Sequence, residues 1–462
     1  MIATDETVTP MTLEWQQMRK TFHQSTTLAA LVLAGWQMGM WLARAFVEYE
    51  LNQRAQQPEQ WGHCCECGTR LHSKGYASRR MLTLVGWVEW RRRVGRCPNR
   101  CGGSQVVPLD EELGLAPYQQ TSMELMRLGC LLAVFLPFGL AVHLLEQLSG
   151  VSVSDAAVWQ WVQHFGGQQM AQVQVEVNDW QQGSKPQVEV MDEDVATLPL
   201  LIGADGVTVP FRPHPKSNKG KIIYQEIKVA LLTRLGNRLK RTGEQVTQLV
   251  QRRLVAVRGT VNDLQPLLEV EAHRQELTKA KQVVWISDGA RGFWRLFERC
   301  FAAIAIGILD FYHATEHLYA AAEAYGSTVK NRTPQQWVIR LRHQLRHGYV
   351  HHILNEFAAL LRYASTPDAA KPKLRQVRNY LKIHQQHLQY RQFKKLGLPI
   401  GSGMVESACK WLITQRFKGA GMRWSEPGFD HLLHLRVAWV NQRFDELFAD
   451  HPLSPTLYSP NQ

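Results

Sequence analysis

The chain has 462 residues, of which 45% are hydrophobic, so it is long enough for several domains and too apolar to be a disordered polypeptide. Its 53 lysines and arginines outnumber its 40 acidic residues and give a formal net charge of +13. This excess of positive charge favours an anionic partner such as nucleic acid or a membrane surface.

The two most apolar stretches argue against a membrane partner. Residues 128–145 contain Pro137 and two glycines, and residues 27–43 are short and run into Arg44. We expect both stretches to form buried helices. The sequence does not open with a charged leader, a short apolar region and a cleavage site, so we expect a cytoplasmic protein and not a secreted one.

Helices are predicted for two regions before residue 178. Residues 1–58 predict an N-terminal helical region, and residues 113–177 predict a second helical domain. In the second domain, apolar residues at helical spacing stop at Ser149-Gly150, and a new helix starts near Ser154. This pattern is typical of a helix-turn-helix that reads DNA, although plain helix bundles contain the same kind of turn.

Cysteine spacing predicts a metal site within residues 59–112. Two close pairs, one C-x-x-C and one C-x-x-x-C, supply the four thiolates that commonly bind one structural Zn²⁺: Cys64, Cys67, Cys97 and Cys101. We therefore predict a zinc ribbon, with His63 or Cys65 as alternative ligands in the first pair. The scattered cysteines are interpreted as packing residues: Cys130, Cys300 and Cys409.

The stretch between the cysteine pairs, "RRMLTLVGWVEWRRR", predicts a β-hairpin that turns at Val85-Gly86. Its second strand ends in Arg91, Arg92 and Arg93. These arginines either follow a DNA backbone or form a solvated strand end.

Beyond a polar linker predicted at residues 178–189, strand patterns replace helical ones up to residue 310. Three predicted strands come first, and the apolar run of the first ends at Asp205. After a helix near 261–277, two more buried strands end at Asp288 and Asp310. This order predicts a multidomain α/β protein whose mixed sheet has acidic residues at one polar edge.

Carboxylates from separate elements can hold two Mg²⁺ ions about 3.5–4 Å apart, as phosphoryl transfer requires. Asp205, Asp288 and Glu406 form such a set, each beside small residues that let a phosphate approach. Taken singly, an Asp-Gly after a strand is a common turn, and a glutamate can complement a helix N-terminus. Glu406, however, is followed by basic residues suited to a polyphosphate: Lys410, Arg416, Lys418 and Arg423.

Five stretches carry a family resemblance: "IGADGVTVP", "YQEIKV", "WISDGARGFWRLF", "ILDFYHATEHL" and "GLPIGSGMVESACKWLITQRFKGAGMRW". They resemble bacterial insertion-sequence transposases of the ISKra type, which are similar to the wider Mutator-like DDE transposases. The resemblance covers about residues 60 to 440, including the zinc ribbon and the helix-turn-helix. It implies a ribonuclease H-like core with a mixed five-stranded sheet, divided into 190–310 and 396–447 by an all-helical insertion at 311–395, with a tail at 448–462.

The same resemblance assigns roles to individual residues. The catalytic acids fall on Asp205, Asp288 and Glu406. A family pattern of Cys or Asp, two residues and then His is matched by Asp310 and His313, which are implied to be auxiliary active-site residues. The extra thiol in "CCECG" departs from the family pattern, so the choice of zinc ligands stays open.

Three further groups of polar residues have alternative interpretations. His317, four residues after His313, either joins a metal site or packs against its neighbours. Glu226 in "YQEIKV" is interpreted as a solvated strand residue. A basic helical face, useful for DNA binding if it points at the core, is predicted for Arg340, Arg342 and Arg346.

Together these features predict a DDE transposase that binds double-stranded DNA at the ends of its element, cuts phosphodiesters and joins the 3′-hydroxyl ends to target DNA. Two alternatives remain open: a magnesium-dependent nuclease without strand transfer, and a catalytically inactive or domesticated DNA-binding protein. Because a synapse joins two DNA ends, we expect a homodimer or higher oligomer on DNA.

Overall fold

The computed structural model describes residues 13–56, 61–64, 66–101, 105–213, 222–243, 245–326 and 333–448. The alternative zinc ligand Cys65 and nearly all of the predicted tail lie outside these ranges. Contacts divide the chain into two compact units, Met1–Val162 with Glu446–Gln462, and Gln163–Asp445.

The first unit begins with the predicted helices, α1 (Leu13–Gln24) and α2 (Leu28–Arg54). Thr27 caps α2 by accepting a hydrogen bond from the Ala30 amide at 3.2 Å. The expectation of a buried helix at 27–43 is wrong, because Ala34 is the only residue of α2 that is buried. Among the described residues, α2 alone is long and apolar enough to cross a membrane, judged by length and composition.

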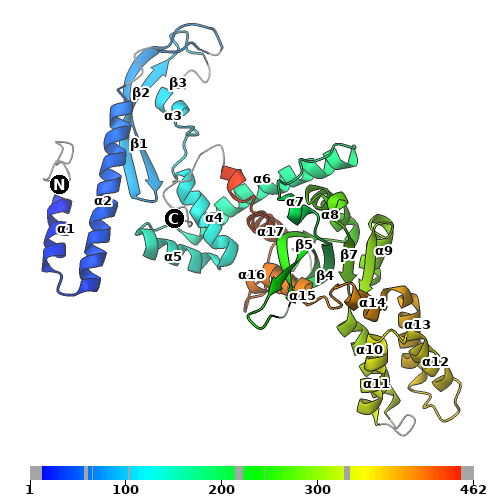
Figure 1. Cartoon of the computed structure of the whole chain (residues 1–462). Helices are drawn as coiled ribbons and strands as arrows, with labels where there is room; N and C mark the ends of the chain where they lie inside the picture. Colours follow the sequence, from blue (N-terminus) through cyan, green and yellow to red (C-terminus); the bar gives the residue numbers. More distant parts are fainter. Residues whose placement is uncertain are drawn as a thin grey trace. The chain divides into compact units, whose positions relative to one another are not determined.

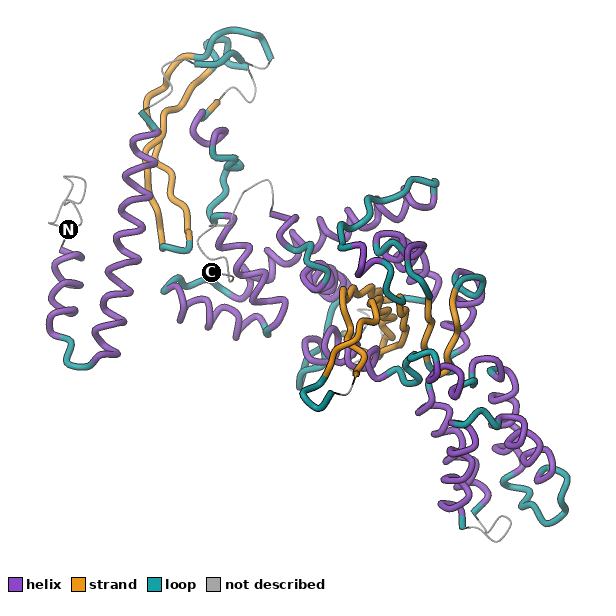
Figure 2. Tube along the Cα trace, in the orientation of Figure 1, coloured by secondary structure: helices purple, strands orange, loops and turns teal. Residues whose placement is uncertain are grey.

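A three-stranded antiparallel sheet follows, in the order β1 (His72–Thr83), β2 (Gly86–Arg96) and β3 (Gln105–Val106) (Figure 2). Thr83 pairs with Gly86, so the predicted hairpin is confirmed and its turn lies at residues 84–85. Gly86 has a φ of 98°, a conformation that favours glycine. The short helix α3 (Pro108–Glu112) brings Asp110 against the hairpin.

Three helices follow: α4 (Met123–Phe135), α5 (Phe138–Ser149) and α6 (Asp155–Gln181). Pro137 separates α4 from α5, and only part of the 128–145 stretch is buried, with Cys130 and Leu145 fully enclosed and Leu140 45% exposed. Gly150 ends α5 in the left-handed conformation, as the predicted turn requires. Helix α6 continues to Gln181, so the linker starts later than residue 178, and the division between units falls inside this helix.

A five-stranded mixed sheet forms the centre of the second unit, in the order β6-β5-β4-β7-β8. Strands β4 (Leu200–Phe211), β5 (Ile223–Leu239) and β6 (Gln245–Arg258) are antiparallel, whereas β7 (Val283–Ser287) and β8 (Ala305–Leu309) run parallel to β4. The predicted mixed sheet is therefore confirmed. Its apolar strands pack into the largest core cluster of the described chain.

Helices cover this sheet, as Figure 1 shows. Helix α8 (Val261–Arg274) packs on β5 and β6, and α9 (Arg291–Cys300) packs on β7. The short α7 (Glu193–Ala196) contacts β5. Of the C-terminal elements, α15 (Gly403–Cys409) contacts β4 and β5, a π-helical turn (Lys410–Thr414) contacts β4, and α17 (Glu426–Val440) contacts β6. The short α16 (Gln415–Phe417) packs against the π-helical turn. Residues remote in sequence thus meet at this sheet.

Between β8 and α15, the regular elements of the described residues are all helices, as predicted (Figure 1). It contains α10 (Phe311–Tyr325), α11 (Pro334–Arg346), α12 (Val350–Leu360), α13 (Lys371–Ile383) and α14 (Tyr390–Lys395). Apolar residues of α10 to α14 belong to the same core cluster as the sheet, among them Trp337, Leu374 and Tyr390. The segment is therefore packed onto the core of its unit.

Candidate active site

Three acidic residues meet at one edge of the five-stranded sheet because of the strand register. Ala204 of β4 pairs with Ser287 of β7, which pairs with Leu309 of β8. Each of these three residues is followed in sequence by an aspartate: Asp205, Asp288 and Asp310. The three acids therefore lie side by side on neighbouring strands of the sheet.

Asp205 lies inside β4, which corrects the expectation that its strand ends there. Pairing of β4 with β7 stops at Ala204, but pairing with β5 continues to Phe211. Asp205 therefore stands where β4 loses one neighbour and keeps the other. This arrangement leaves its side chain half-buried beside Asp288.

Glu406 reaches the same edge from α15. A Cβ atom added to Gly203 would lie 2.2 Å from Val405 Cγ2, so the helix rests directly on the backbone of β4 at that glycine. Ser402, at the start of α15, donates a hydrogen bond from Oγ to Glu406 Oε1 at 3.2 Å. Its amide donates to Asp310 Oδ2, so one residue joins the helix acid to the third strand-end acid.

Asp310, His313 and Glu406 form a compact group whose candidate ligand atoms all lie within 4.8 Å of one another. Asp310 is fully buried and caps α10 by accepting hydrogen bonds from the amides of Tyr312 and His313. Burial alone would raise the pKa of Asp310, but hydrogen bonds from His313 and Ser402 lower it to about 2. The structure thus brings together the two residues of "DFYH" and Glu406.

His313 completes this corner of the site. Its Nδ1 lies 3.6 Å from Asp310 Oδ1, an ion-pair distance too long for a good hydrogen bond. The same nitrogen is buried without a hydrogen-bond partner among the described residues. Interaction with Asp310 raises the pKa of His313 to about 9.

The acids influence one another electrostatically. Burial raises the pKa of Asp205, and the negative charges of Asp288 and Glu406 raise it further. Burial and the charge of Asp205 also raise the pKa of the buried Cys409 thiol. A bound divalent cation would relieve the repulsion among these carboxylates, and hard oxygen donors are the ligands that Mg²⁺ prefers. The donor set of the site therefore fits magnesium.

The basic residues after Glu406 divide into two groups. Lys410, Lys418 and Arg423 are exposed, as a role at a phosphate backbone requires. Arg416 is only 1% exposed, with its guanidinium carbon 5.2 Å from the centre of the Trp424 ring. Burial lowers the pKa of Arg416 to about 10. The prediction that Arg416 binds DNA is therefore wrong, and this residue is part of the core.

A buried arginine supports the π-helical turn behind Glu406. In this turn, the hydrogen-bond pattern of the helix is interrupted at residues 410–414, and such interruptions are frequent at functional sites. Arg436 of α17, 2% exposed, donates from Nε to the Leu412 carbonyl at 2.7 Å and from Nη2 to the Trp411 carbonyl at 2.5 Å. These bonds hold the π-helical turn that directly follows α15, the helix of Glu406.

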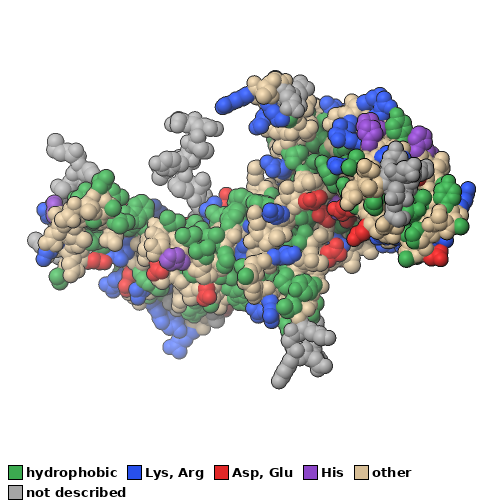
Figure 3. Space-filling model, turned by 90° about the horizontal axis from the view of Figure 1, so that it is seen from below, with side chains coloured by type: hydrophobic (Ala, Val, Ile, Leu, Met, Phe, Trp, Pro, Cys, Tyr) green, Lys and Arg blue, Asp and Glu red, His purple; other side chains and the backbone are tan. Residues whose placement is uncertain are grey.

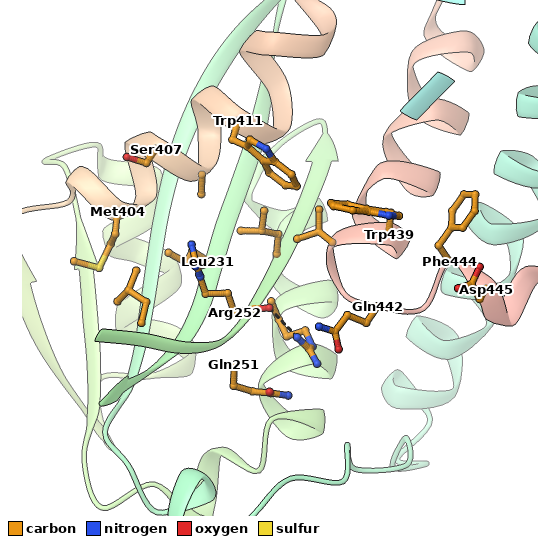
Figure 4. A pocket seen from close by; sticks show the side chains of 15 residues that line it. Leu231, Gln251, Arg252, Met404, Ser407, Trp411, Trp439, Gln442, Phe444 and Asp445 are labelled. Atoms are coloured by element: carbon orange, nitrogen blue, oxygen red, sulfur yellow. Dashed lines mark hydrogen bonds between the residues drawn. The ribbon is translucent and has the colours of Figure 1, made fainter. Parts of the chain in front are cut away.

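A cavity of about 980 Å³ lies on another side of the same helix (Figure 4). Met404 and Ser407 of α15 line it, and Arg252 enters from β6. Figure 4 shows Trp411 and Trp439 side by side at the cavity, with ring centres 5.9 Å apart. None of the acids discussed above lines it, so it is separate from the acidic edge.

The four predicted zinc ligands converge. The sulfur atoms of Cys64, Cys67, Cys97 and Cys101 all lie within 4.8 Å of one another. Cys67 Sγ is 3.4 Å from Cys97 Sγ, which is 3.8 Å from Cys101 Sγ. Tetrahedral zinc with bonds of about 2.3 Å places its sulfur ligands about 3.8 Å apart, so this cluster fits a Zn²⁺ ion.

The predicted strand-end arginines, residues 91–93, lie within β2 and do not form a free basic strand end. Arg92 and Arg79 both pair with Asp110, at 2.9 and 2.6 Å, in a largely buried cluster. Arg91 lies over the Tyr76 ring at 5.6 Å, and Arg93 lies over the Trp61 ring at 5.4 Å. We therefore do not include these three arginines among the DNA-binding residues proposed below.

The arginines of the helical insertion do not form the single basic face that was predicted. Arg340 points inward and pairs with Glu356, to which Trp337 also donates at 2.8 Å. Arg342 and Arg346 are exposed, together with His343 and His347. In Figure 3, Lys, Arg and His side chains gather over the insertion at the right-hand end of the molecule. This exposed face can meet a polyanion.

The remaining polar residues have ordinary surroundings. His317 stacks on Tyr380 with ring centres 3.9 Å apart, so the packing interpretation describes it. Glu226 is exposed and pairs with Lys228 at 2.7 Å, as expected for a strand residue. Sequence reasoning missed Gly203, Ser402 and Arg436, although Ser402 lies within the "GSG" turn that drew attention to Glu406.

Known proteins were compared with the chain by sequence and by structure. No protein-family model matches the chain. A protein of Streptococcus gallolyticus named "UPF0236 protein in vanSb 3'region" is 26% identical over 389 residues, covering 81% of this chain and 75% of that protein. The Drosophila P element transposase strand transfer complex aligns with 74% of this chain and 82% of that chain, at 11% identity and a TM-score of 0.24. A TM-score at that level does not establish a shared fold.

Proposed function

We propose that the protein is a DNA transposase of the DDE class, with Asp205, Asp288 and Glu406 as its catalytic acids and a ribonuclease H-like core. One observation carries the proposal. The strand register places Asp205 beside Asp288, and the contact of Val405 with Gly203 sets the Glu406 helix on the same strand. Three acids from elements far apart in sequence thereby share one edge of a mixed sheet.

This arrangement suits phosphodiester cleavage. Two magnesium ions held by Asp205, Asp288 and Glu406 would supply an activated water and stabilise the leaving oxygen. Ser402 orients Glu406 through its hydroxyl and Asp310 through its amide. Asp310 and His313 serve as auxiliary residues that hold this corner of the site in place.

Basic residues near the acids would bind the DNA backbone. Lys410, Lys418 and Arg423 are exposed on the segment that follows Glu406. They would offset the repulsion between the carboxylates and a phosphate, because nucleic-acid affinity comes largely from contacts between cations and phosphates. Arg342 and Arg346 of the insertion are proposed to extend this contact.

The first unit is proposed to recognise the ends of the element. Its Cys64, Cys67, Cys97 and Cys101 cluster would bind one structural zinc ion, and α5 with α6 would act as a helix-turn-helix. We further propose a dimer or higher oligomer on DNA, because joining requires two element ends, and a cytoplasmic location at the nucleoid.

The test is a cleavage and strand-transfer assay with purified protein, Mg²⁺ and labelled duplexes that carry the terminal sequences of the DNA segment encoding the chain. A transposase cuts at these ends and joins them to a target plasmid. Cutting without joined product would instead identify a magnesium-dependent nuclease. End binding without cutting would identify a catalytically inactive DNA-binding protein.

A further inference from the structure

Tyr380 brings the helical insertion to the acidic edge of the sheet. It lies on α13, far in sequence from the strands. A Cβ atom added to Gly289 would lie 2.3 Å from Tyr380 Oη and 2.2 Å from its Cε2. Gly289 directly follows Asp288, so the hydroxyl rests on the backbone next to a proposed metal ligand.

Packing holds the ring of Tyr380 in place. His317 of α10 stacks on it with ring centres 3.9 Å apart and an interplanar angle of 34°. His384 contacts its edge with ring centres 5.1 Å apart. An aromatic ring held between neighbours on two sides and the Gly289 backbone on a third gives its hydroxyl a fixed position.

Among the residues that the structure describes, none forms a hydrogen bond with this hydroxyl. Tyr380 Oη is buried and has no partner among the described residues. Asp288, which lies close by, accepts instead from the Ala290 amide through Oδ1 at 3.0 Å and from Trp294 Nε1 through its carbonyl at 2.7 Å. A buried hydroxyl without a partner lowers stability, so its presence calls for a functional role or for a water, ion or ligand that supplies the partner.

We propose that Tyr380 donates a hydrogen bond to a phosphate oxygen of the DNA strand bound at Asp205, Asp288 and Glu406. This assignment rests on the proposed function and adds a substrate contact from the insertion. A neutral donor suits the position, because a lysine or arginine there would form ion pairs with the carboxylates and compete with the metal ions. Tyrosine keeps its proton at neutral pH and can only donate to an unprotonated phosphate oxygen.

The experiment compares Tyr380→Phe with wild type and with a matched control, Tyr390→Phe. Tyr390 is fully buried in the same insertion, but its hydroxyl donates to the Leu309 carbonyl at 3.0 Å. Three quantities are measured for each protein: the melting temperature without DNA, the Kd for a labelled element-end duplex in Ca²⁺, and the cleavage rate in Mg²⁺.

Loss of an unpartnered hydroxyl leaves the melting temperature of Tyr380→Phe unchanged or higher, whereas Tyr390→Phe lowers it. Loss of one hydrogen bond to a charged phosphate weakens DNA binding by about 10- to 150-fold, with slower cleavage. Tyr390→Phe keeps its DNA affinity.

Two results would overturn the assignment. A lower melting temperature with wild-type DNA affinity would make the Tyr380 hydroxyl structural. Unchanged melting temperature and unchanged affinity, with slower cleavage, would place its acceptor on a metal-bound water instead of the phosphate. Failure of wild type itself to bind and cut DNA would contradict the proposed function, and this outcome is read from the wild-type sample alone.

Discussion

Gly203 offers the sharpest structural test of how Glu406 is positioned. In Gly203→Ala the new Cβ would lie 2.2 Å from Val405 Cγ2, whereas carbon atoms in contact stay about 3.5–4.0 Å apart. Helix α15 or the Val405 side chain must therefore move by more than about 1 Å. Inserting a methyl group into a packed core typically costs about 1–3 kcal/mol.

We expect Gly203→Ala to reduce the cleavage rate by a larger factor than its effect on folding stability alone would suggest. A misplacement of about 1 Å at a catalytic group can cost about 100-fold in rate. We expect Gly203→Ala to unfold at lower denaturant concentration and to cleave end DNA about 100-fold more slowly than wild type. Circular dichroism in urea and single-turnover cleavage measure the two effects.

Two further variants make this prediction specific. Val405→Ala removes the clashing methyl group, so Gly203→Ala combined with Val405→Ala should regain much of the lost cleavage. Gly236→Ala, in β5 of the same sheet, brings its Cβ only to 3.1 Å from Val250 Cγ2 and should cost much less. Wild-type cleavage by Gly203→Ala, or no recovery in a folded double variant, would refute this account of how Glu406 is placed.

Three other predictions follow from separate parts of the chain. Metal analysis should find about one zinc per chain, lost in Cys64→Ser/Cys97→Ser and retained in Cys300→Ser, and unchanged zinc in the double variant would contradict the four-cysteine site. Arg436→Met should lower the free energy of unfolding by about 1.5–3 kcal/mol and slow cleavage, with partial recovery in Arg436→Lys, whereas wild-type stability in Arg436→Met would show that the π-helical turn needs no such support. Burial and the charge of His387 lower the pKa of His384 to about 4. Between pH 6.5 and 4 the unfolded chain therefore binds a proton that the folded chain does not, so stability decreases as the pH is lowered through this range. His384→Phe should reduce this fall in melting temperature, and an identical pH dependence would contradict the assignment.

The acids were predictable because a short apolar run that ends in Asp is a local pattern. Asp288 and Asp310 end buried strands, as their sequences indicate. Asp205 was found by the same pattern, but β4 runs past it, because pairing with β5 depends on a strand that begins 18 residues further along, at Ile223. The local sequence pattern therefore identified Asp205 correctly but wrongly placed it at the end of its strand.

Burial and exposure were predicted less well, because they depend on what covers an element. Helix α2 is as apolar as a core helix, yet Ala34 is its only buried residue. Arg416 stands in a basic stretch that suggests DNA binding, yet it packs on Trp424 in the core. Tyr380 and Gly289 are separated by 91 positions, so no local pattern could indicate their contact.

The most direct test of the central claim is single-turnover cleavage of a labelled element end in Mg²⁺ by Asp205→Asn, Asp288→Asn and Glu406→Gln. Loss of a residue that only supports a metal ligand typically costs 10- to 100-fold, so loss of a ligand itself should cost at least about 100-fold. Melting temperature and end binding should stay close to wild type, and double variants should be no slower than single ones, because the residues act as one site. Near-wild-type cleavage by a folded Glu406→Gln would contradict the claim that these three acids form one catalytic site.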